Sequence, residues 1–137
     1  MRSREAAPRA GRLPARREDL ARAFYADGLG LTEVAKPEAL RARGGAWFRA
    51  HADDTVTAEL HVGVEDPFRP ATRAHPALLL DDVAELDRTA DRLAASGHEV
   101  DHTERHTFDG FVRVHVRDPH GNRVELLAST DGQVTDR

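Results

Sequence analysis

Apolar and polar positions in the second half of the chain alternate in a way that predicts one helix and four strands. The helix starts after Asp82, a favourable N-cap that Glu85 follows three positions later, and its apolar face comprises Val83, Leu86, Ala90, Leu93 and Ala94. A short buried strand is expected before the helix at 75–80, and strands after it at 98–103, 111–117 and 122–128. Residues 118–121 carry Pro and Gly where a type I turn favours them, so they should form a tight turn between the last two strands.

The first half predicts the same order of elements, except that its opening strand is hard to see. Leu20, Ala23 and Phe24 share one face of a helix expected over 18–27, and Gly28 and Gly30 should end it. Strands are expected near 32–34, 46–50 and 57–64, and residues 65–74, which contain two prolines, look like a linker.

An internal repeat supports this reading. Shifting the chain against itself by 66 residues gives ungapped identities at Leu20/Leu86, Arg22/Arg88, Glu33-Val34/Glu99-Val100, Gly44/Gly110 and Glu59-Leu60/Glu125-Leu126. Helix falls on helix and strand on strand, which is a stronger signal than the identities themselves. A duplicated module predicts a pseudo-two-fold domain with a cleft between its halves.

Composition narrows the class of protein. A chain of 137 residues, 39% hydrophobic and 32% charged, suits one globular domain. The net charge of −4 and the few aromatic residues disfavour nucleic acid as a partner, and no apolar run approaches the roughly 20 residues that span a bilayer. With no cysteine, disulfides and thiolate metal sites are excluded. With no secretory signal visible, we expect a cytoplasmic protein without a membrane partner.

Strand alternation separates a helix-facing side from a polar side. Val112, Val114 and Val116 should pack on the helices, whereas the polar side gathers Glu59, His61, His75, Arg113, His115, Arg123 and Glu125. Such a face could simply be solvated. Imidazoles and carboxylates from several strands could equally form a divalent-metal shell, and Arg113 and Arg123 could bind a substrate carboxylate or phosphate.

Four segments resemble the vicinal oxygen chelate superfamily, which includes glyoxalases, bleomycin-resistance proteins and extradiol dioxygenases. Residues 23–31 (AFYADGLGL) resemble its helix end, 59–64 (ELHVGV) the last strand of its first module, and 75–77 (HPA) the first strand of its second module. Residues 117–126 (RDPHGNRVEL) resemble its closing hairpin, the most specific of these signals.

The resemblance covers about 13–128 and implies an α+β fold in which two βαβββ modules form a pseudo-two-fold sheet around a cleft. The modules would span about 13–64 and 75–128, with an irregular segment at 1–12 and a tail at 129–137. It also implies a homodimer, because sheet edges and cleft rims in this family are commonly completed by a second subunit.

Metal-dependent members of the family place ligands on the first and last strand of each module. By that pattern His75 and Glu125 are the second pair, and Glu59 or its close rival His61 is the closing-strand ligand of the first module. The remaining position falls at Pro8/Arg9, where neither residue can donate a side-chain lone pair. The site would therefore have three protein ligands plus water, or no metal. His115 is expected to face the substrate.

Two functions follow from the resemblance. The first is a small metal-dependent lyase or isomerase that acts on a small, oxygen-rich substrate, with Ni²⁺, Zn²⁺, Mn²⁺ or Fe²⁺ as Lewis acid and Glu125 or Glu59 as base. Its substrate-binding residues would be Arg113, His115 and Arg123. The second is a metal-free protein that binds and sequesters a small drug-like molecule, as bleomycin-resistance proteins do. The His75/Glu125 pair favours the enzyme, and Arg9 favours the binding protein.

Overall fold

The computed structural model describes residues 18–131 and divides into two compact units, Met1–Arg69 and Pro70–Arg137. The described part mixes helices with two β-sheets, which confirms the α+β class. The predicted irregular segment 1–12, the opening strand expected near Pro8 and Arg9, and the end of the predicted tail lie outside the described residues. The pairing of two modules about a pseudo-two-fold axis stays a prediction.

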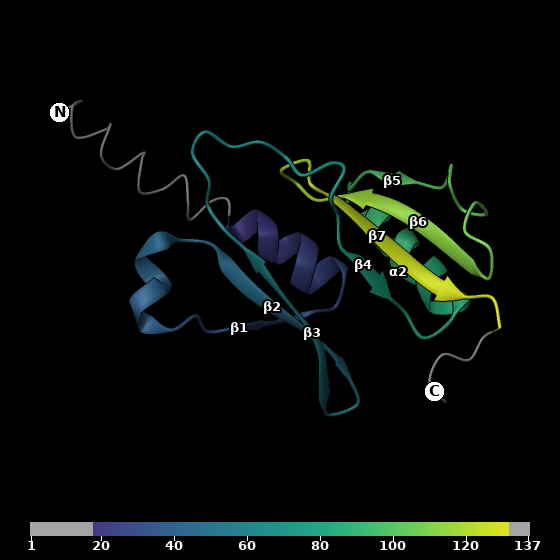
Figure 1. Ribbon diagram of the computed structural model, residues 1–137, viewed down its shortest axis with the longest axis horizontal. Helices are drawn as coiled ribbons and strands as arrows, with labels where there is room; N and C mark the ends of the chain where they lie inside the picture. Colours follow the sequence, from purple (N-terminus) through teal and green to yellow (C-terminus); the bar gives the residue numbers. More distant parts are fainter. Residues whose placement is uncertain (1–17, 132–137) are drawn as a thin grey trace. The chain divides into compact units, whose positions relative to one another are not determined.

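Unit 1 contains a three-stranded antiparallel sheet in the order β1–β2–β3 (Figure 1). Its strands are β1 (Thr32–Val34), β2 (Ala46–Ala52) and β3 (Thr55–Val62), and a 3₁₀ helix, η2 (Glu38–Arg43), connects the first two. All three strands were expected from the sequence, although β3 begins and ends two residues earlier than predicted.

The helix of unit 1 begins as an α-helix at 18–21 and continues as the π-helix η1 (Arg22–Gly28). Its buried face comprises Ala21, Phe24, Tyr25 and Gly28. The predicted face was wrong at Leu20, which is 48% exposed, and at Ala23, which is also exposed. These buried positions are i, i+3, i+4 and i+7 counted from Ala21, so the stripe joins both aromatic rings with a small residue at each end. Gly30 ends the helix with φ of 79°, as expected.

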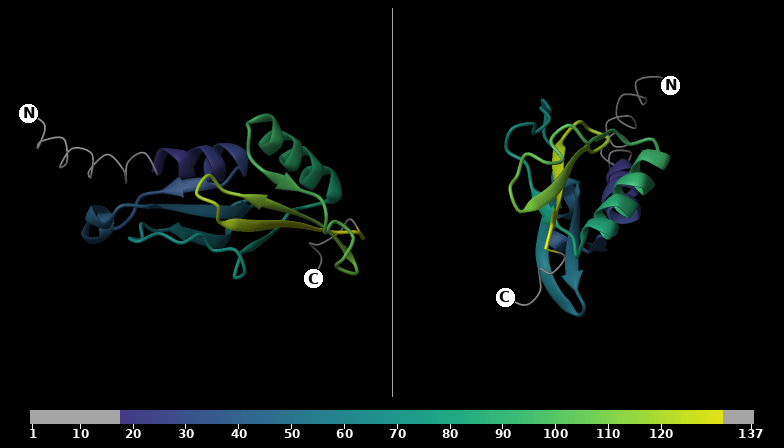
Figure 2. Two further views of the ribbon diagram at one scale, coloured as in Figure 1. Left: turned by 90° about the horizontal axis from the view of Figure 1, so that it is seen from above. Right: turned by 90° about the vertical axis from the view of Figure 1, so that its right-hand side faces the viewer.

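Unit 2 has the predicted order β, α, β, β, β. It consists of β4 (Ala77–Leu79), α2 (Val83–Ala95), β5 (Val100–Asp101), β6 (Phe111–Arg117) and β7 (Arg123–Ser129). The sheet order is β4–β7–β6–β5, with β4 parallel to β7 and the other pairs antiparallel. Helix α2 covers one face of this sheet (Figure 2). The Asp82 side chain caps α2 by accepting a hydrogen bond from the Glu85 amide at 2.8 Å.

The core of unit 2 lies between α2 and the sheet. As predicted, Val112, Val114 and Val116 are buried, at 6%, 0% and 0% exposure. The predicted helix face was wrong at Ala94, which is exposed, while Thr89 is buried instead. The expectation of a buried strand at 75–80 was also wrong, because β4 is a short edge strand whose Leu79 is 52% exposed. Within residues 18–131, no helix has the length and apolarity needed to cross a membrane.

Candidate functional site

The face of the unit 2 sheet that α2 leaves uncovered carries a cluster of titratable side chains. The valines of β6 point to α2, so His115 between them points the other way, directly opposite Glu125 on β7. Both side chains are buried, at 5% and 4% exposure. A histidine and a glutamate held on adjacent paired strands have little freedom to move apart, so the backbone fixes their spacing.

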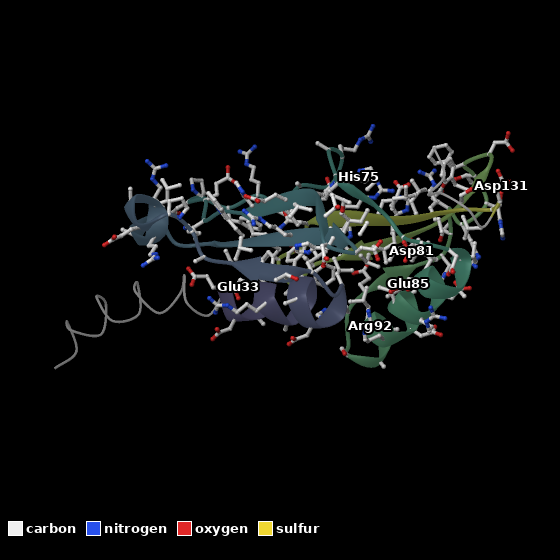
Figure 3. All side chains as sticks on the ribbon, turned by 90° about the horizontal axis from the view of Figure 1, so that it is seen from below. Glu33, His75, Asp81, Glu85, Arg92 and Asp131 are labelled. Atoms are coloured by element: carbon white, nitrogen blue, oxygen red, sulfur yellow. The ribbon has the colours of Figure 1, made fainter. Side chains whose placement is uncertain are left out.

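His75 joins this pair from the segment that leads into β4. Its Nε2 lies 3.1 Å from Glu125 Oε1. The Glu125 amide donates to the Pro76 carbonyl at 2.9 Å, which ties the backbone beside His75 to β7. Figure 3 labels Glu85 and Arg92 on α2. His75 lies on the opposite side of the sheet from that helix. Three strands or their flanks therefore converge on one carboxylate.

The hydrogen bonds of His75 define which of its nitrogens is available. Its Nδ1 lies 2.8 Å from the Arg73 carbonyl, which is an acceptor, so Nδ1 carries the proton. In a neutral imidazole the Nε2 lone pair then faces the carboxylate oxygen of Glu125. Two acceptors at this distance need a proton or a cation between them, and a backbone carbonyl on the second nitrogen is the usual support of a metal-binding histidine.

His115 leaves one buried nitrogen without a partner. Its Nε2 is 3.3 Å from Glu125 Oε1, but its Nδ1 is buried and has no hydrogen-bond partner among the described residues. Burial lowers the pKa of His115, and the charge of Arg123 lowers it further. The imidazole is therefore held neutral near pH 7, the form that binds metals.

Glu125 keeps its negative charge despite its burial. Burial by itself would raise the pKa of this carboxyl, but the interaction with His75 and the charge of Arg113 outweigh it, so that the pKa lies below its ordinary value. Arg113 Nη1 lies 3.4 Å from Glu125 Oε1. The cluster thus offers an ionised carboxylate beside two imidazoles, which are donor types that a divalent cation binds.

The spacing of the three side chains fits a metal ion. Candidate ligand atoms of His75, His115 and Glu125 all lie within 4.8 Å of one another, and this is the one such group among residues 18–131. Ligands bound at 2.0–2.1 Å in a tetrahedral site stand about 3.3 Å apart. The distances from Glu125 Oε1 to the two Nε2 atoms, 3.1 and 3.3 Å, match that separation.

Of the two predicted substrate-binding arginines, Arg113 is already engaged in hydrogen bonds and ion pairs within unit 2. Arg113 contacts Glu125, the Glu104 carbonyl, the Glu104 carboxylate and the Thr107 hydroxyl. Arg123 makes only a long contact of 3.5 Å to the Thr72 carbonyl and pairs with no carboxylate of the described chain. Arg123 is therefore the freer cation of the two.

The two predicted first-module ligands lie together on the sheet of unit 1. Glu59 binds Arg49 through one carboxylate oxygen at 2.6 Å and His61 through the other at 2.7 Å. These hydrogen bonds, that from His61 foremost, lower the pKa of Glu59. The His61 ring also stacks on Trp47, its cross-strand neighbour, with centroids 3.6 Å apart. Both side chains are well supplied with partners inside their own unit.

The family model of the glyoxalase/bleomycin resistance protein/dioxygenase superfamily matches residues 12–126. The chain belongs to this superfamily. A glyoxalase family protein from Bacillus anthracis is 38% identical to this superfamily member, with a TM-score of 0.68 over 82% of this chain and 84% of the other. Lactoylglutathione lyase from Agrobacterium tumefaciens is 28% identical, with a TM-score of 0.52 over 81% of this chain and 84% of the other.

A third solved structure, TnmS3, an antibiotic-binding protein from Streptomyces sp. CB03234, shares the fold at 22% identity. Its TM-score is 0.58 over 82% of this chain and 87% of the other. No curated protein matches the superfamily member described here. The comparisons thus establish the superfamily, and the likeness to TnmS3 shows a shared fold alone.

The proximity of His115 to His75 and Glu125 is the feature that strand alternation alone did not reveal. Alternation placed His115 on the correct face, but its distance to Glu125 depends on hairpin register. The register pairs 117 with 123 and 115 with 125, so five residues, 118–122, separate the two strands. Counting outward from a four-residue turn at 118–121 would instead pair 117 with 122, so the turn alone did not give the register that places His115 opposite Glu125.

Proposed function

We propose that this protein is a metal-dependent lyase or isomerase that acts on a small, oxygen-rich substrate. One observation carries the proposal: two histidine nitrogens approach the same buried carboxylate oxygen, although His75 holds its only proton on the other nitrogen when it is neutral. A cation shared by His75, His115 and Glu125 would resolve that conflict. Membership of a superfamily that contains lyases supports the same conclusion.

His75 and Glu125 would hold the metal, with His115 as third ligand. Histidine and carboxylate donors suit Ni²⁺, Zn²⁺, Mn²⁺ or Fe²⁺, and a bound ion of this kind supplies Lewis acidity toward a carbonyl or enediolate oxygen. The Arg73 carbonyl orients the His75 ring, and Arg113 orients the carboxylate of Glu125. This set is complete within unit 2.

The second carboxylate oxygen of Glu125 gives the site its proton acceptor. The contacts from His75, His115 and Arg113 all converge on Oε1, so Oε2 is the oxygen that could accept a proton from a carbon or hydroxyl of the substrate. Glu59 is the weaker candidate for this task, since Arg49 and His61 already occupy both of its oxygens. On the family pattern, Glu59 or His61 remains the predicted closing-strand ligand of the first module.

The second candidate function is metal-free binding of a small molecule. Arg9 favours it, because the family's first-strand ligand position falls there and a guanidinium does not ligate metals. The fold shared with TnmS3 shows that such a scaffold serves in an antibiotic-binding protein. In that case His75 would carry the proton that bridges it to Glu125.

Elemental analysis of protein purified without a histidine tag decides between the two. We expect about one divalent ion per chain, and His75→Ala, His115→Ala and Glu125→Gln should each reduce its affinity by more than the roughly 10–100-fold that loss of a merely supporting group causes. Screening of small carbonyl compounds with neighbouring oxygens by NMR should then reveal turnover that a chelator abolishes.

The matched control is His51→Ala, an exposed histidine at the β2–β3 hairpin that should leave metal content unchanged. Glu59→Gln and His61→Ala should also retain the ion if His115 is the third ligand. Loss of metal in either of these two variants, with retention in His115→Ala, would assign the third ligand to unit 1. Absence of any bound ion in the wild type would favour the binding protein.

A further inference from the structure

A recess lies beside the histidine–glutamate cluster on the same face of the unit 2 sheet. It has a volume of about 180 Å³ and is lined by Glu99, Asp101, His115, Val116, Arg117 and Arg123. At about 30 Å³ per water molecule, this is room for roughly six waters. Whole drug-sized ligands fill about 300–1,000 Å³, so the recess suits one functional group of a ligand.

The sheet register brings two guanidinium groups to this recess. Arg117 on β6 and Arg123 on β7 are directly paired, and their side chains share the face that carries His115. Like charges on opposed residues repel one another, so this arrangement costs stability unless an anion lies between them. A bound oxyanion would remove that cost.

The two acidic residues of the recess form no close ion pair with Arg123, although the pKa of Asp101 is lowered chiefly by its hydrogen bonds with Thr103 and in part by the charge of Arg123. Asp101 Oδ1 already accepts hydrogen bonds from the amide and hydroxyl of Thr103, at 2.9 and 2.5 Å. Glu99 is largely exposed and reaches Arg117 only at 4.0 Å. Arg123 pairs with no carboxylate within residues 18–131. Arg123 is therefore the cation of the recess that has no direct carboxylate partner among the described residues.

His115 joins the recess to the cluster that would hold the metal. His115 lines the recess and is only 5% exposed. Its Nδ1 is buried and has no hydrogen-bond partner among the described residues. A ligand group seated against Arg123 would therefore stand next to a residue that also contacts Glu125. The two sites are adjacent enough for one small molecule to occupy both.

We propose that the recess between Arg117, Arg123 and His115 binds the carboxylate or phosphate group of the substrate. The inference rests on the proposed function only in assigning this anion to the substrate, which would then be a small organic acid or phosphate ester with its reacting oxygens toward Glu125. Arg123 provides the main charge-assisted hydrogen bonds, and Arg117 provides a second guanidinium opposite it. Arg113 is not part of this site, because its donors are already engaged.

Titration of the chelator-treated protein with sodium phosphate and with sodium acetate tests the site without metal. At constant ionic strength, we expect NMR shifts at the amides of 115–117 and 123, and at the Arg123 guanidinium, that sodium chloride does not produce. Arg123→Gln should weaken binding by about tenfold or more, the effect of one charge-assisted hydrogen bond. Arg123→Lys should fall between wild type and Arg123→Gln, because it keeps the charge and loses the bidentate geometry.

Arg88→Gln is the matched control, because Arg88 is exposed on α2 and lies outside the recess. It should bind as the wild type does. Stronger shifts with phosphate than with acetate would assign the site to phosphate, and the reverse to carboxylate. Shifts that chloride reproduces, or that persist in a folded Arg123→Gln, would overturn the anion site.

The outcome is separable from that of the proposed function. Anion binding in a protein that no divalent ion stabilises would refute the metal enzyme and leave the anion site standing. Metal binding without specific anion-induced shifts would refute the anion site and leave the metal enzyme standing. Repetition with the metal-loaded protein should give tighter anion binding if one substrate spans both sites.

Discussion

At the scale of single residues, the decisive feature is how three side chains share one carboxylate oxygen. Glu125 receives contacts from His75, His115 and Arg113 at 3.1 to 3.4 Å, all at Oε1. The environment holds Glu125 ionised and His115 neutral, which are the states that a metal ion needs and that a proton would compete for. The affinity of the site for a metal ion should therefore decrease at acidic pH.

In the absence of metal, the free energy of unfolding should decrease as the pH is lowered, for the same reason. Because the pKa of His115 is lowered on folding, chiefly by burial, the unfolded chain takes up the proton first. Its contribution is complete above the unfolded pKa of about 6.5 and is lost as the pH falls below it. The lowered pKa of Glu125 adds a loss below its ordinary value of about 4.3. Each group can add at most about 1.4 kcal/mol per pH unit.

Urea unfolding of chelator-treated protein between about pH 8 and pH 5 measures this slope. His115→Gln should have a shallower slope than the wild type across the histidine range. His51→Gln, at an exposed position, should keep the wild-type slope. Equal slopes in His115→Gln and wild type would show that His115 is not held neutral by the fold.

At the scale of elements, β6 and β7 separate the core from the site by alternation. Val114 is fully buried between α2 and the sheet, whereas His115 beside it faces the opposite side. Val114→Asp should prevent folding, because an unpaired buried charge costs several kcal/mol of a total stability of about 5–15 kcal/mol. Val56→Asp on β3, where the side chain is 45% exposed, should fold normally. A cooperative thermal transition of Val114→Asp by circular dichroism would disprove the assigned strand phase.

Helix α2 depends on the cap at its first turn. Asp82→Ala removes the hydrogen bond to the Glu85 amide and should lower the free energy of unfolding by about 1 kcal/mol. Its neighbour Asp81 is exposed and makes no such bond, so Asp81→Ala should change stability by less than about 0.5 kcal/mol. Chemical unfolding of the two variants side by side measures both changes in the free energy of unfolding. Equal changes would show that the Asp82 cap does not stabilise α2.

The elements that the sequence predicted well are those with strong periodicity or a specific turn. Strand β6 was predicted with its observed ends, Phe111 and Arg117, because valine and polar residues alternate along it without interruption. The helix of unit 1 was placed one position out of phase, because Leu20 is apolar but exposed and Ala21 is small but buried. Strand β4 looked buried because Ala77–Leu79 is wholly apolar, and composition does not tell an edge strand from a central one.

The sequence identified the residue types of the candidate site but only some of the contacts between them. His75 and Glu125 came from a family pattern, and the structure brings them within 3.1 Å. His115 needed the hairpin register, and Arg117 needed the direct pairing with Arg123. Which partners satisfy Arg113 depends on the loop that carries Glu104 and Thr107, which no periodicity describes.

At the scale of the whole molecule, we expect two copies of the chain to associate. In unit 2, β4 is a short edge strand with Leu79 half exposed, and Phe108 is 41% exposed. Homodimers are the expectation for this superfamily, and such edges and apolar side chains are suitable contacts. Light scattering at high micromolar concentration should give twice the chain mass of 15.1 kDa. A mass of one chain under those conditions would refute the dimer.

The central claim is that His75, His115 and Glu125 bind a divalent metal ion. Thermal melts of chelator-treated protein with and without Ni²⁺, Zn²⁺, Mn²⁺ or Fe²⁺ test it most directly, since an ion that binds only the folded state stabilises it by mass action. At 100 times the dissociation constant, we predict that at least one ion raises the Tm of the wild type by an amount on the order of 10 °C, and leaves Glu125→Gln unchanged. A wild-type Tm that none of the four ions shifts would contradict the account.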